Sequence, residues 1–430
     1  MVEVCPLRGW RYDLSQVGEL SDVVCPPYDV IDRALQDELY KRHPCNAIRL
    51  ELNREEPGDA SADARYQRAA AFWKQWRSDG ILLQEHEEAF YVYHQHFAWE
   101  GTSYVRRGFL CRLKLEEFGR GHVFPHEQTL SGPKADRLAL FHACRAHFSP
   151  VFGLYPDDDG GIQEQLDDAV RDQPPIEATD HLGVVNRLWT VTRPQVINAV
   201  RQALRERPIF IADGHHRYET SLNYCRSLGA IDPYHPARFV LIHCVGMSDP
   251  GLQILPTHRL VGGIPAWTAQ EWQALLSPVF ASEVMGTGAE GARATWEAME
   301  IEGTQHVLGV GSRQDHTWLL ARLQQPEWME RLVPQRSAAW RELAVSRLHE
   351  LVLGHLLKQR LGDVAPQLRY VHRLEEVLSG LEEGFTAGWL VPPATIEHVK
   401  TIASGLETMP PKSTYFYPKL LTGMVFYSLQ

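Results

Sequence analysis

A short apolar run, typical of a buried strand, is followed directly by five residues that open a predicted helix: Asp213, Gly214, His215, His216 and Arg217. A helix start presents backbone N–H groups and the positive end of the helix dipole, which together attract phosphate. Gly214 permits a tight turn and close approach of a ligand. Arg217 can form two parallel hydrogen bonds to phosphate oxygens. This pattern predicts a phosphate-binding turn.

The other side chains of this turn add further chemistry. His215 and His216 can donate hydrogen bonds to phosphate or move protons. Asp213 can hold Mg²⁺ or orient a hydroxyl group. The alternative is structural: Asp213 caps the helix and two surface histidines follow it.

A second polar group lies between residues 126 and 137. Glu127 is the best carboxylate for a general base beside a bound hydroxyl. His126 can orient Glu127 or contact phosphate. Lys134 and Arg137 are three residues apart, so both can project from one face of a helix and, with Arg217, neutralise a polyphosphate. The alternative is a polar loop whose groups satisfy one another.

A third candidate is the loop that contains Lys412, Ser413 and Thr414 after two prolines. A lysine beside small hydroxyl residues suits phosphate. The GxxxxGK[ST] spacing is absent, so this loop is not a Walker A motif. Lys412 and Lys419 can equally be ordinary surface lysines.

Further residues are predicted to line a substrate pocket. Tyr28 and Asp29 follow two prolines in a rigid turn, and His258 and Arg259 lie on a predicted strand. His126 and Thr129 complete this predicted set. For the Tyr28 turn, the alternative is a stiff loop that covers the core.

We predict no protein-held metal cluster. His122 and His126 would share a helical face only in a helix, which Pro125 disfavours. The seven cysteines are widely spaced and include no CxxC pair, so neither a thiolate zinc site nor a disulfide framework is expected. Reduced thiols indicate a cytoplasmic location.

Composition limits the class of protein. Hydrophobic residues make up 44% and charged residues 23%, as in globular proteins. The net charge of −11 disfavours a general nucleic-acid partner. No apolar run reaches the ~20 residues of a membrane helix, and the first residues carry charges where an export signal would be apolar. The expected partners are a small-molecule substrate and a nucleotide, with a homo-oligomer left open.

The elements that must position these residues mix strands and helices, so we predict an α+β (mixed α/β) fold. The clearest pattern is a hairpin of two alternating runs, 89–97 and 102–115. A strand is expected over 46–52, and a helix is expected to start at Pro194. We expect a core domain at 1–264, a second α/β domain at 265–385, and a C-terminal segment, 386–430, that returns to the core.

The turn at 213–217 resembles the phosphate-binding turn of the ParB/sulfiredoxin-like superfamily, in particular its free serine kinases. Nearly the whole chain resembles a bacterial family known as domain of unknown function 1015. The resemblance is carried by Pro26 to Val30, by His126, Glu127, Thr129, Lys134, Asp136 and Arg137, by 213–220, by Leu255 to Arg259, and by Met409 to Phe416 with Pro418 and Lys419. It implies a ParB/sulfiredoxin-like core with an additional α/β domain.

The residues and the resemblance together predict a small-molecule kinase or phosphotransferase. Glu127 would take the acceptor's proton, with Asp213 or Mg²⁺ assisting, and His216 would help to spread charge. The resemblance implies free L-serine, or a similar hydroxylated metabolite, as acceptor. The donor is expected to be ATP or ADP with Mg²⁺, or another phosphate compound. The alternatives are hydrolysis of a nucleotide or phosphoester and a non-enzymatic, ParB-like nucleotide sensor.

Overall fold

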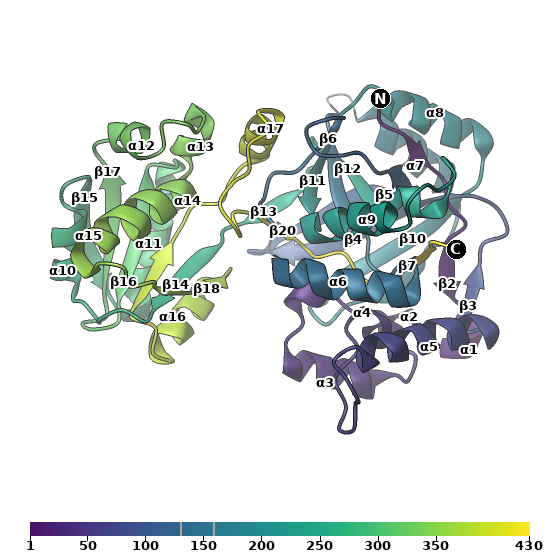
Figure 1. Cartoon of the computed structure of the whole chain (residues 1–430). Coiled ribbons are helices and arrows are strands. Elements are labelled where there is room, and N and C mark those ends of the chain that lie inside the picture. Colours follow the sequence, from purple (N-terminus) through teal and green to yellow (C-terminus); the bar gives the residue numbers. More distant parts are fainter. Residues whose placement is uncertain (130, 158–159) are drawn as a thin grey trace. The chain divides into compact units, whose positions relative to one another are not determined.

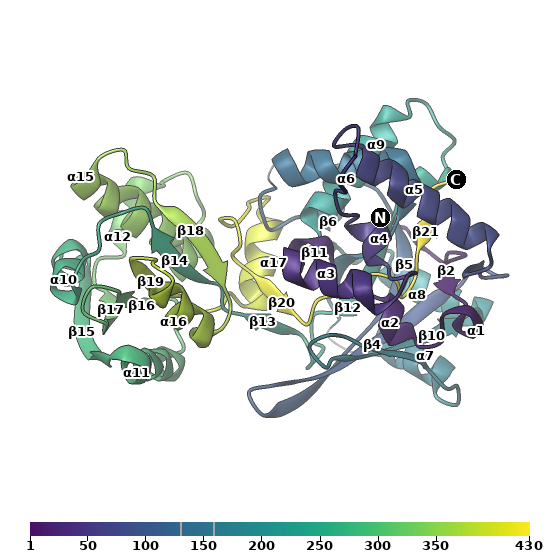
Figure 2. The ribbon, with the colours of Figure 1, turned by 90° about the horizontal axis from the view of Figure 1, so that it is seen from below.

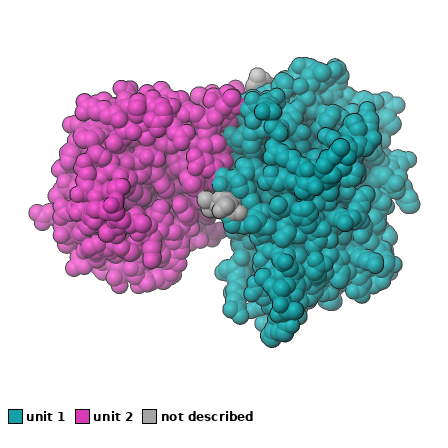
Figure 3. Space-filling model, viewed as in Figure 1, with its two compact units in different colours: residues 1–125, 129–253, 418–430 teal, residues 126–128, 254–417 magenta. Residues whose placement is uncertain are grey.

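The computed structural model describes residues 1–129, 131–157 and 160–430. It forms two compact units, coloured separately in Figure 3. Unit 1 contains residues 1–125, 129–253 and 418–430, and unit 2 contains residues 126–128 and 254–417. Each has its own sheet and helices, which confirms the mixed α/β class. The predicted second domain, 265–385, lies within unit 2.

Unit 1 is built on a mixed sheet of nine strands among the described residues. The order is β6-β11-β8-β12-β5-β4-β10-β9, and β1 pairs with β5. Parallel pairing occurs between β6 and β11 and between β8 and β12. The bounds are β1 Val4–Cys5, β4 Phe90–Trp99, β5 Thr102–Lys114, β6 Val123–Phe124, β8 Val151–Tyr155, β9 Ile176–Thr179, β10 Val185–Val191, β11 Ile209–Asp213 and β12 Phe239–Gly246.

Strands β4 and β5 form the predicted hairpin, which extends beyond the rest of the sheet in Figure 2. Successive side chains of a strand point to opposite faces. Phe90 and Val92 therefore belong to the main apolar core of unit 1. Tyr93 points to the other face, where its hydroxyl accepts a hydrogen bond from the backbone of Leu421. The C-terminal segment thus lies against the second face of this sheet.

Helices cover both faces of this sheet (Figure 1). Apolar residues of α7 and α8 pack into the main core with Phe90 and Val92. Helix α8 begins at Pro194 as predicted, since proline suits the first helical position. Helices α5, α6 and α9 pack in sequence against one another. Their bounds are α5 Ala64–Ser78, α6 Ser131–Cys144, α7 Gly161–Val170, α8 Pro194–Leu204 and α9 His215–Ser227.

The N-terminal region of unit 1 consists of short elements. They are β2 Trp10–Tyr12, α1 Leu14–Val17, α2 Leu20–Val23, the 3₁₀ turn η1 Tyr28–Val30, α3 Arg33–Arg42, α4 Ile48–Glu51 and β3 Leu82–Gln84. Strand β2 pairs with β3, and β7 Ala146–His147 pairs with β21 Tyr427–Ser428.

The strand predicted over 46–52 is wrong, because this segment forms the short helix α4. Asn46 is fully buried, and its side-chain amide donates to the carbonyls of Asp22 and Val24. Its side-chain oxygen accepts from the backbone N–H of Ile48. Such local side-chain bonds favour a turn over a strand, and here the turn starts the helix.

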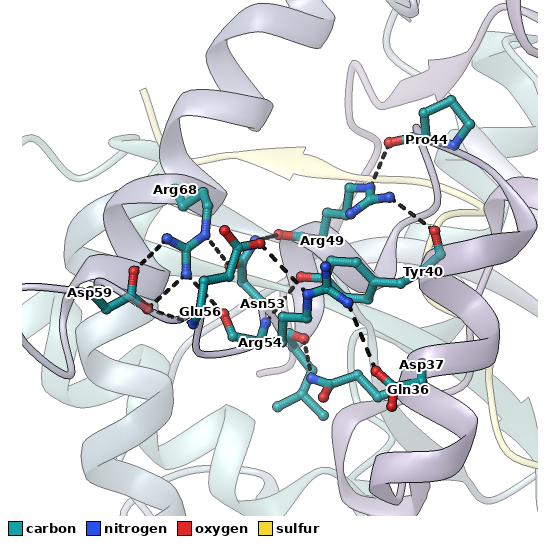
Figure 4. Close-up of polar contacts among 11 residues, drawn as sticks. Gln36, Asp37, Tyr40, Pro44, Arg49, Asn53, Arg54, Glu56, Asp59 and Arg68 are labelled. Atoms are coloured by element: carbon teal, nitrogen blue, oxygen red, sulfur yellow. Dashed lines mark hydrogen bonds and ion pairs between the residues drawn. The ribbon is translucent and has the colours of Figure 1, made fainter.

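A polar network fixes the chain on both sides of α4 (Figure 4). Arg68 of α5 donates to the side chain of Asn53 and pairs with Asp59 at 2.7 Å. Arg49 donates to the carbonyls of Pro44 and Tyr40. The helix that carries Glu51 is thereby held at both ends.

Unit 2 contains an antiparallel sheet of six strands among the described residues, in the order β15-β17-β16-β19-β14-β18. Helices α11 and α16 pack on one face through residues such as Ala292 and Val377. The strands are β14 His258–Gly262, β15 Phe280–Thr287, β16 Val307–Ser312, β17 Thr317–Leu323, β18 Gln367–Val371 and β19 Ala387–Leu390, and β13 Gln253–Leu255 pairs separately with β20 Tyr415–Tyr417.

The helices of unit 2 include one long π-helical segment, η3 Arg347–Leu357, which carries His349. The others are α10 Ala269–Leu276, α11 Gly288–Glu302, α12 Glu327–Leu332, α13 Ala338–Glu342, α14 Ala344–Ser346, α15 Lys358–Leu361, α16 Leu374–Glu382 and α17 Ile396–Ser404. Within the described ranges, no helix of either unit is long and apolar enough to cross a membrane.

Candidate functional site

The predicted turn lies in unit 1, where β11 ends and α9 begins. Gly214 is the residue before the helix and has φ 87° and ψ 28°, the left-handed conformation that favours glycine. A β-bulge between Ile211 and Asp213 precedes it, and Asp213 stands opposite Phe152 of β8. Bulges re-aim side chains at functional sites. The helix cap is Gly214 and not Asp213, so the structural alternative of an Asp213 cap is wrong.

Two cations hold the carboxylate of Asp213. The guanidinium of Arg217 lies 2.6 Å from Oδ2, and the ammonium of Lys419 lies 2.6 Å from Oδ1. Lys419 comes from the C-terminal segment, 206 positions away in the sequence. Its side chain is 12% exposed, so it is not the ordinary surface lysine of the sequence alternative. The turn therefore contains a preformed cluster of two cations and one carboxylate.

Arg217 is a structural clamp of the turn. It is 5% exposed and also donates to the carbonyl of Pro150. Its guanidinium packs on Gly214, where an added Cβ would lie 3.0 Å from it. Burial lowers the pKa of Arg217, but the charges of Asp213, Asp29 and Glu51 outweigh burial and raise it. A direct contact between Arg217 and phosphate stays a prediction.

A second buried cluster of unit 1 surrounds Arg137 of α6. Its guanidinium is 4% exposed, lies 2.6 Å from Asp136 and 3.6 Å from Glu51, and stacks 4.2 Å from the centre of the Tyr28 ring. Burial lowers the pKa of Arg137, but the charges of Glu51 and Asp136 outweigh the effect of burial, so the pKa is raised. Burial also raises the pKa of the Tyr28 hydroxyl.

This cluster is electrostatically connected to the turn. Glu51 and Asp29 are both among the charges that act on Arg217. Asp29 itself is exposed. The substrate roles of Tyr28 and Asp29 and the phosphate role of Arg137 stay predictions.

Lys134 and Thr129 have a common partner on α9. The Lys134 ammonium and the Thr129 hydroxyl donate to the same oxygen of Glu219, at 2.8 and 2.9 Å. Lys134 and Arg137 thus contact different carboxylates, although both belong to α6. The phosphate role of Lys134 and the substrate role of Thr129 stay predictions.

The two histidines of the turn differ in exposure. His215 is buried and His216 is half-buried, at the first two positions of α9. His216 is therefore the more accessible of the pair. Its predicted catalytic role, and the predicted phosphate contact of His215, stay predictions.

Unit 2 contains its own group of predicted residues. The ring of His126 lies 2.8 Å from the hydroxyl of Thr414, and its carbonyl accepts from the backbone of Met409. Glu127 pairs in parallel with Met409 through the backbone. Ser413 donates to the carbonyl of Pro410. The loop that contains Lys412, Ser413 and Thr414 is thereby anchored to the segment that carries Glu127.

Arg259 is a buried residue that contacts this loop. It is 1% exposed, donates to the carbonyl of Lys412 at 2.8 Å, and lies 3.4 Å from the ring of His349. Burial lowers the pKa of Arg259 to about 10, although Tyr370 and Glu127 act against that shift. Lys412 is exposed and has φ 57°, unusual for a residue other than glycine. The loop is thus held in a defined, strained conformation.

His258 has a structural environment. It is 2% exposed, accepts a hydrogen bond from the backbone of Val391, and packs edge-on against Trp296. Burial lowers its pKa to about 3. A substrate contact from His258 stays a prediction.

Among the described residues, the turn lacks a set of donors suited to a protein-held Mg²⁺. Within the described ranges, no three His, Cys, Asp or Glu side chains gather at a single point. Each oxygen of Asp213 already pairs with a cation. These donors do not fit a resident Mg²⁺, so we derive no step through one.

The sequence interpretation missed three participants: Glu51, Glu219 and Lys419. Glu219 lies inside the recognised segment 213–220, which is a signal for it, but its pairing with Lys134 joins two helices and residues 85 positions apart. The sequence shows Lys419 but gives no sign of its partner Asp213, which is 206 positions away. Glu51 had no local signal, since the segment was expected to be a strand.

Together, the fold and this cluster define a mixed α/β protein with a strand–turn–helix site rich in paired charges. The chain belongs to the family described as "Protein of unknown function (DUF1015)", whose model matches residues 4–346. No curated protein is significantly similar to it in sequence.

Several solved structures are similar to the chain at low identity. A free serine kinase in complex with AMP is 11% identical, covers 69% of this chain and 83% of its own, and has a TM-score of 0.33. SbnI from Staphylococcus aureus is 10% identical and has a TM-score of 0.34; the match covers 74% of this chain and 86% of SbnI. A conserved hypothetical protein from Pyrococcus furiosus is 12% identical, with coverage of 70% and 89% and a TM-score of 0.33. At these TM-scores we transfer no role from them.

Proposed function

We propose that the chain is a phosphotransferase whose turn at Gly214 binds the phosphates of the donor. The observation that carries the proposal is the Asp213 cluster. A left-handed glycine opens α9 beside a carboxylate paired with Arg217 and Lys419. Backbone N–H groups at a helix start and adjacent cations favour phosphate.

The proposed reaction is transfer of a phosphoryl group to a hydroxylated metabolite. The acceptor's hydroxyl oxygen forms a bond to phosphorus while the bond from phosphorus to the donor's leaving oxygen breaks. The hydroxyl proton passes to a carboxylate, for which Glu127 is proposed. The negative charge that remains on the donor is stabilised by the turn and its cations.

Asp213 is the rival base. Its two oxygens pair with Arg217 and Lys419, so both cations would compete with an acceptor's proton for the same oxygens. This favours an electrostatic role for Asp213, in which it holds the two cations at the turn. Glu127 is therefore kept as the proposed base.

The finer proposals follow the motif resemblance in the sequence. We propose a ParB/sulfiredoxin-like core, with ATP or ADP as donor and free L-serine as the first acceptor to test. The remaining predicted phosphate and substrate residues stay part of this proposal.

The test is a product screen. The protein is incubated with Mg²⁺-ATP or Mg²⁺-ADP and a pool of hydroxylated metabolites that includes L-serine, and phosphorylated products are detected by mass spectrometry. A product that forms only with enzyme and acceptor supports the proposal. Release of inorganic phosphate without such a product would instead indicate hydrolysis, and nucleotide binding without turnover would indicate a sensor.

A further inference from the structure

A row of buried polar side chains crosses the sheet of unit 1. Asn186 of β10 stands opposite Gln95 of β4, and Gln95 stands opposite Arg106 of β5. All three are fully buried. Burying polar groups costs free energy unless they are hydrogen-bonded, so these three side chains need hydrogen-bond partners.

The partners of this row lie in the C-terminal segment. The Gln95 amide donates to the carbonyl of Lys419 at 3.0 Å and to Asn186 at 2.9 Å. Arg106 donates to the carbonyl of Pro418 at 2.5 Å and to the side-chain oxygen of Gln95. The carbonyls of Pro418 and Lys419, which belong to the two peptide groups on either side of the Lys419 Cα, are thereby fixed.

The row is also continuous with the turn through an aromatic contact. The guanidinium of Arg106 lies 4.6 Å from the centre of the Phe152 ring. Phe152 in turn stands opposite Asp213 in the sheet. A lysine side chain is long and flexible, so its placement depends on how firmly its backbone is held.

We propose that Lys419 is a phosphate-binding residue of the turn and that Arg106 is a positioning residue that acts through it. The inference rests on the proposed function, because it names a ligand contact at the same site. The ligand class is an anionic phosphate: the phosphate chain of a nucleotide, or inorganic phosphate.

The experiment is a double-mutant cycle on the full chain. Dissociation constants for Mg²⁺-ATP and inorganic phosphate are measured by calorimetry for the wild type, Lys419→Met, Arg106→Met and the double variant. We expect Lys419→Met to weaken the binding of whichever ligand the wild type binds more tightly, by about 10- to 100-fold. Lys419→Arg should restore part of this lost affinity. Arg106→Met should weaken binding in the same direction, and the double variant should be no weaker than Lys419→Met alone.

The matched control is Lys74→Met, which removes an exposed lysine of α5 and should leave binding unchanged. Near-UV circular dichroism checks that each variant is folded. If Arg106→Met does not fold, Gln95→Met takes its place, because it removes the contact with the Lys419 carbonyl.

The outcomes separate the two proposals. Unchanged affinity in Lys419→Met, with a wild type that binds, overturns the inference and leaves the proposed function standing. If the fold-changes in dissociation constant of Lys419→Met and Arg106→Met multiply in the double variant, the positioning role of Arg106 is overturned. A wild type that binds neither ligand contradicts the proposed function and with it the phosphate role of Lys419. In that case the melting temperatures of the same four proteins decide the positioning role: non-additive shifts support it and additive shifts overturn it.

Discussion

At the scale of single residues, the turn depends on a glycine for two separate reasons. Gly214 has a positive φ, and its Cα faces the guanidinium of Arg217. Gly183 has a similar φ of 80°, but a Cβ added there meets no described heavy atom within 4 Å. The pair therefore separates backbone strain from side-chain crowding.

We expect Gly183→Ala to lower the free energy of unfolding by about 1–2 kcal/mol, the cost of a left-handed alanine. Gly214→Ala should lower it by roughly 1–3 kcal/mol more, because the new Cβ crowds a clamped guanidinium. Urea unfolding measures both. Equal losses of unfolding free energy in the two variants would show that crowding against Arg217 does not destabilise the protein.

The assignment of the general base is tested by two isosteric substitutions. Glu127→Gln keeps the shape of the side chain but cannot accept a proton. If Glu127 is the base, turnover should fall by roughly 10²–10⁴-fold with little change in donor affinity. Asp213→Asn is measured in parallel, and loss of turnover in Asp213→Asn alone would exchange the two roles.

At the scale of elements, α4 supports the site through one buried carboxylate. Glu51 is 2% exposed, accepts a hydrogen bond from Ser149, and lies 3.6 Å from Arg137. The network of Figure 4 holds the chain on both sides of this helix. Helix α4 therefore places a negative charge that pairs with Arg137 and also acts on the pKa of Arg217.

Glu51→Gln should lower the free energy of unfolding by on the order of 3 kcal/mol, because it leaves a buried arginine with incomplete compensation. The matched control is Glu55→Gln, since the Glu55 side chain is 70% exposed and its ion pair with Arg65 is 3.9 Å long. That control should change stability by less than about 1 kcal/mol. Similar losses in both variants would contradict the role of α4.

The elements also show what the sequence could and could not predict. The β4–β5 hairpin and α8 were predicted because their patterns are long or carry proline at the start. The turn was predicted because its residues are consecutive. The α4 helix was missed because Asn46 bonds to carbonyls of Asp22 and Val24, contacts that no local pattern reports. The Asp213–Lys419 pair was missed for the same reason, since it joins distant segments.

At the scale of the whole molecule, buried histidines link stability to pH in both units. Burial lowers the pKa of His147 in unit 1 to about 3, and those of His258 and His349 in unit 2 to about 3. In the unfolded chain each would titrate near 6.5. Their stabilising contribution is therefore fully present above about pH 6.5 and is lost as the pH falls toward 3.

We expect the free energy of unfolding to fall by about 1.4 kcal/mol per pH unit for each such histidine within that window. His147→Phe should reduce the slope, because phenylalanine cannot take up a proton when the chain unfolds. Denaturant melts at pH 4.5, 5.5 and 6.5 measure it. The exposed His86 supplies the control, His86→Gln. An unchanged slope in His147→Phe would contradict the assignment.

Calorimetric titration with Mg²⁺-ATP and Mg²⁺-ADP shows most directly whether the turn at Gly214 binds phosphate. We expect saturable binding of one nucleotide per chain to the wild type. Binding to folded Gly214→Ala should be at least about tenfold weaker, because close approach to the backbone is lost. Equal affinity in Gly183→Ala and the wild type is the expected control result. Absence of binding to the wild type, or equal affinity in folded Gly214→Ala, would contradict phosphate binding at this turn.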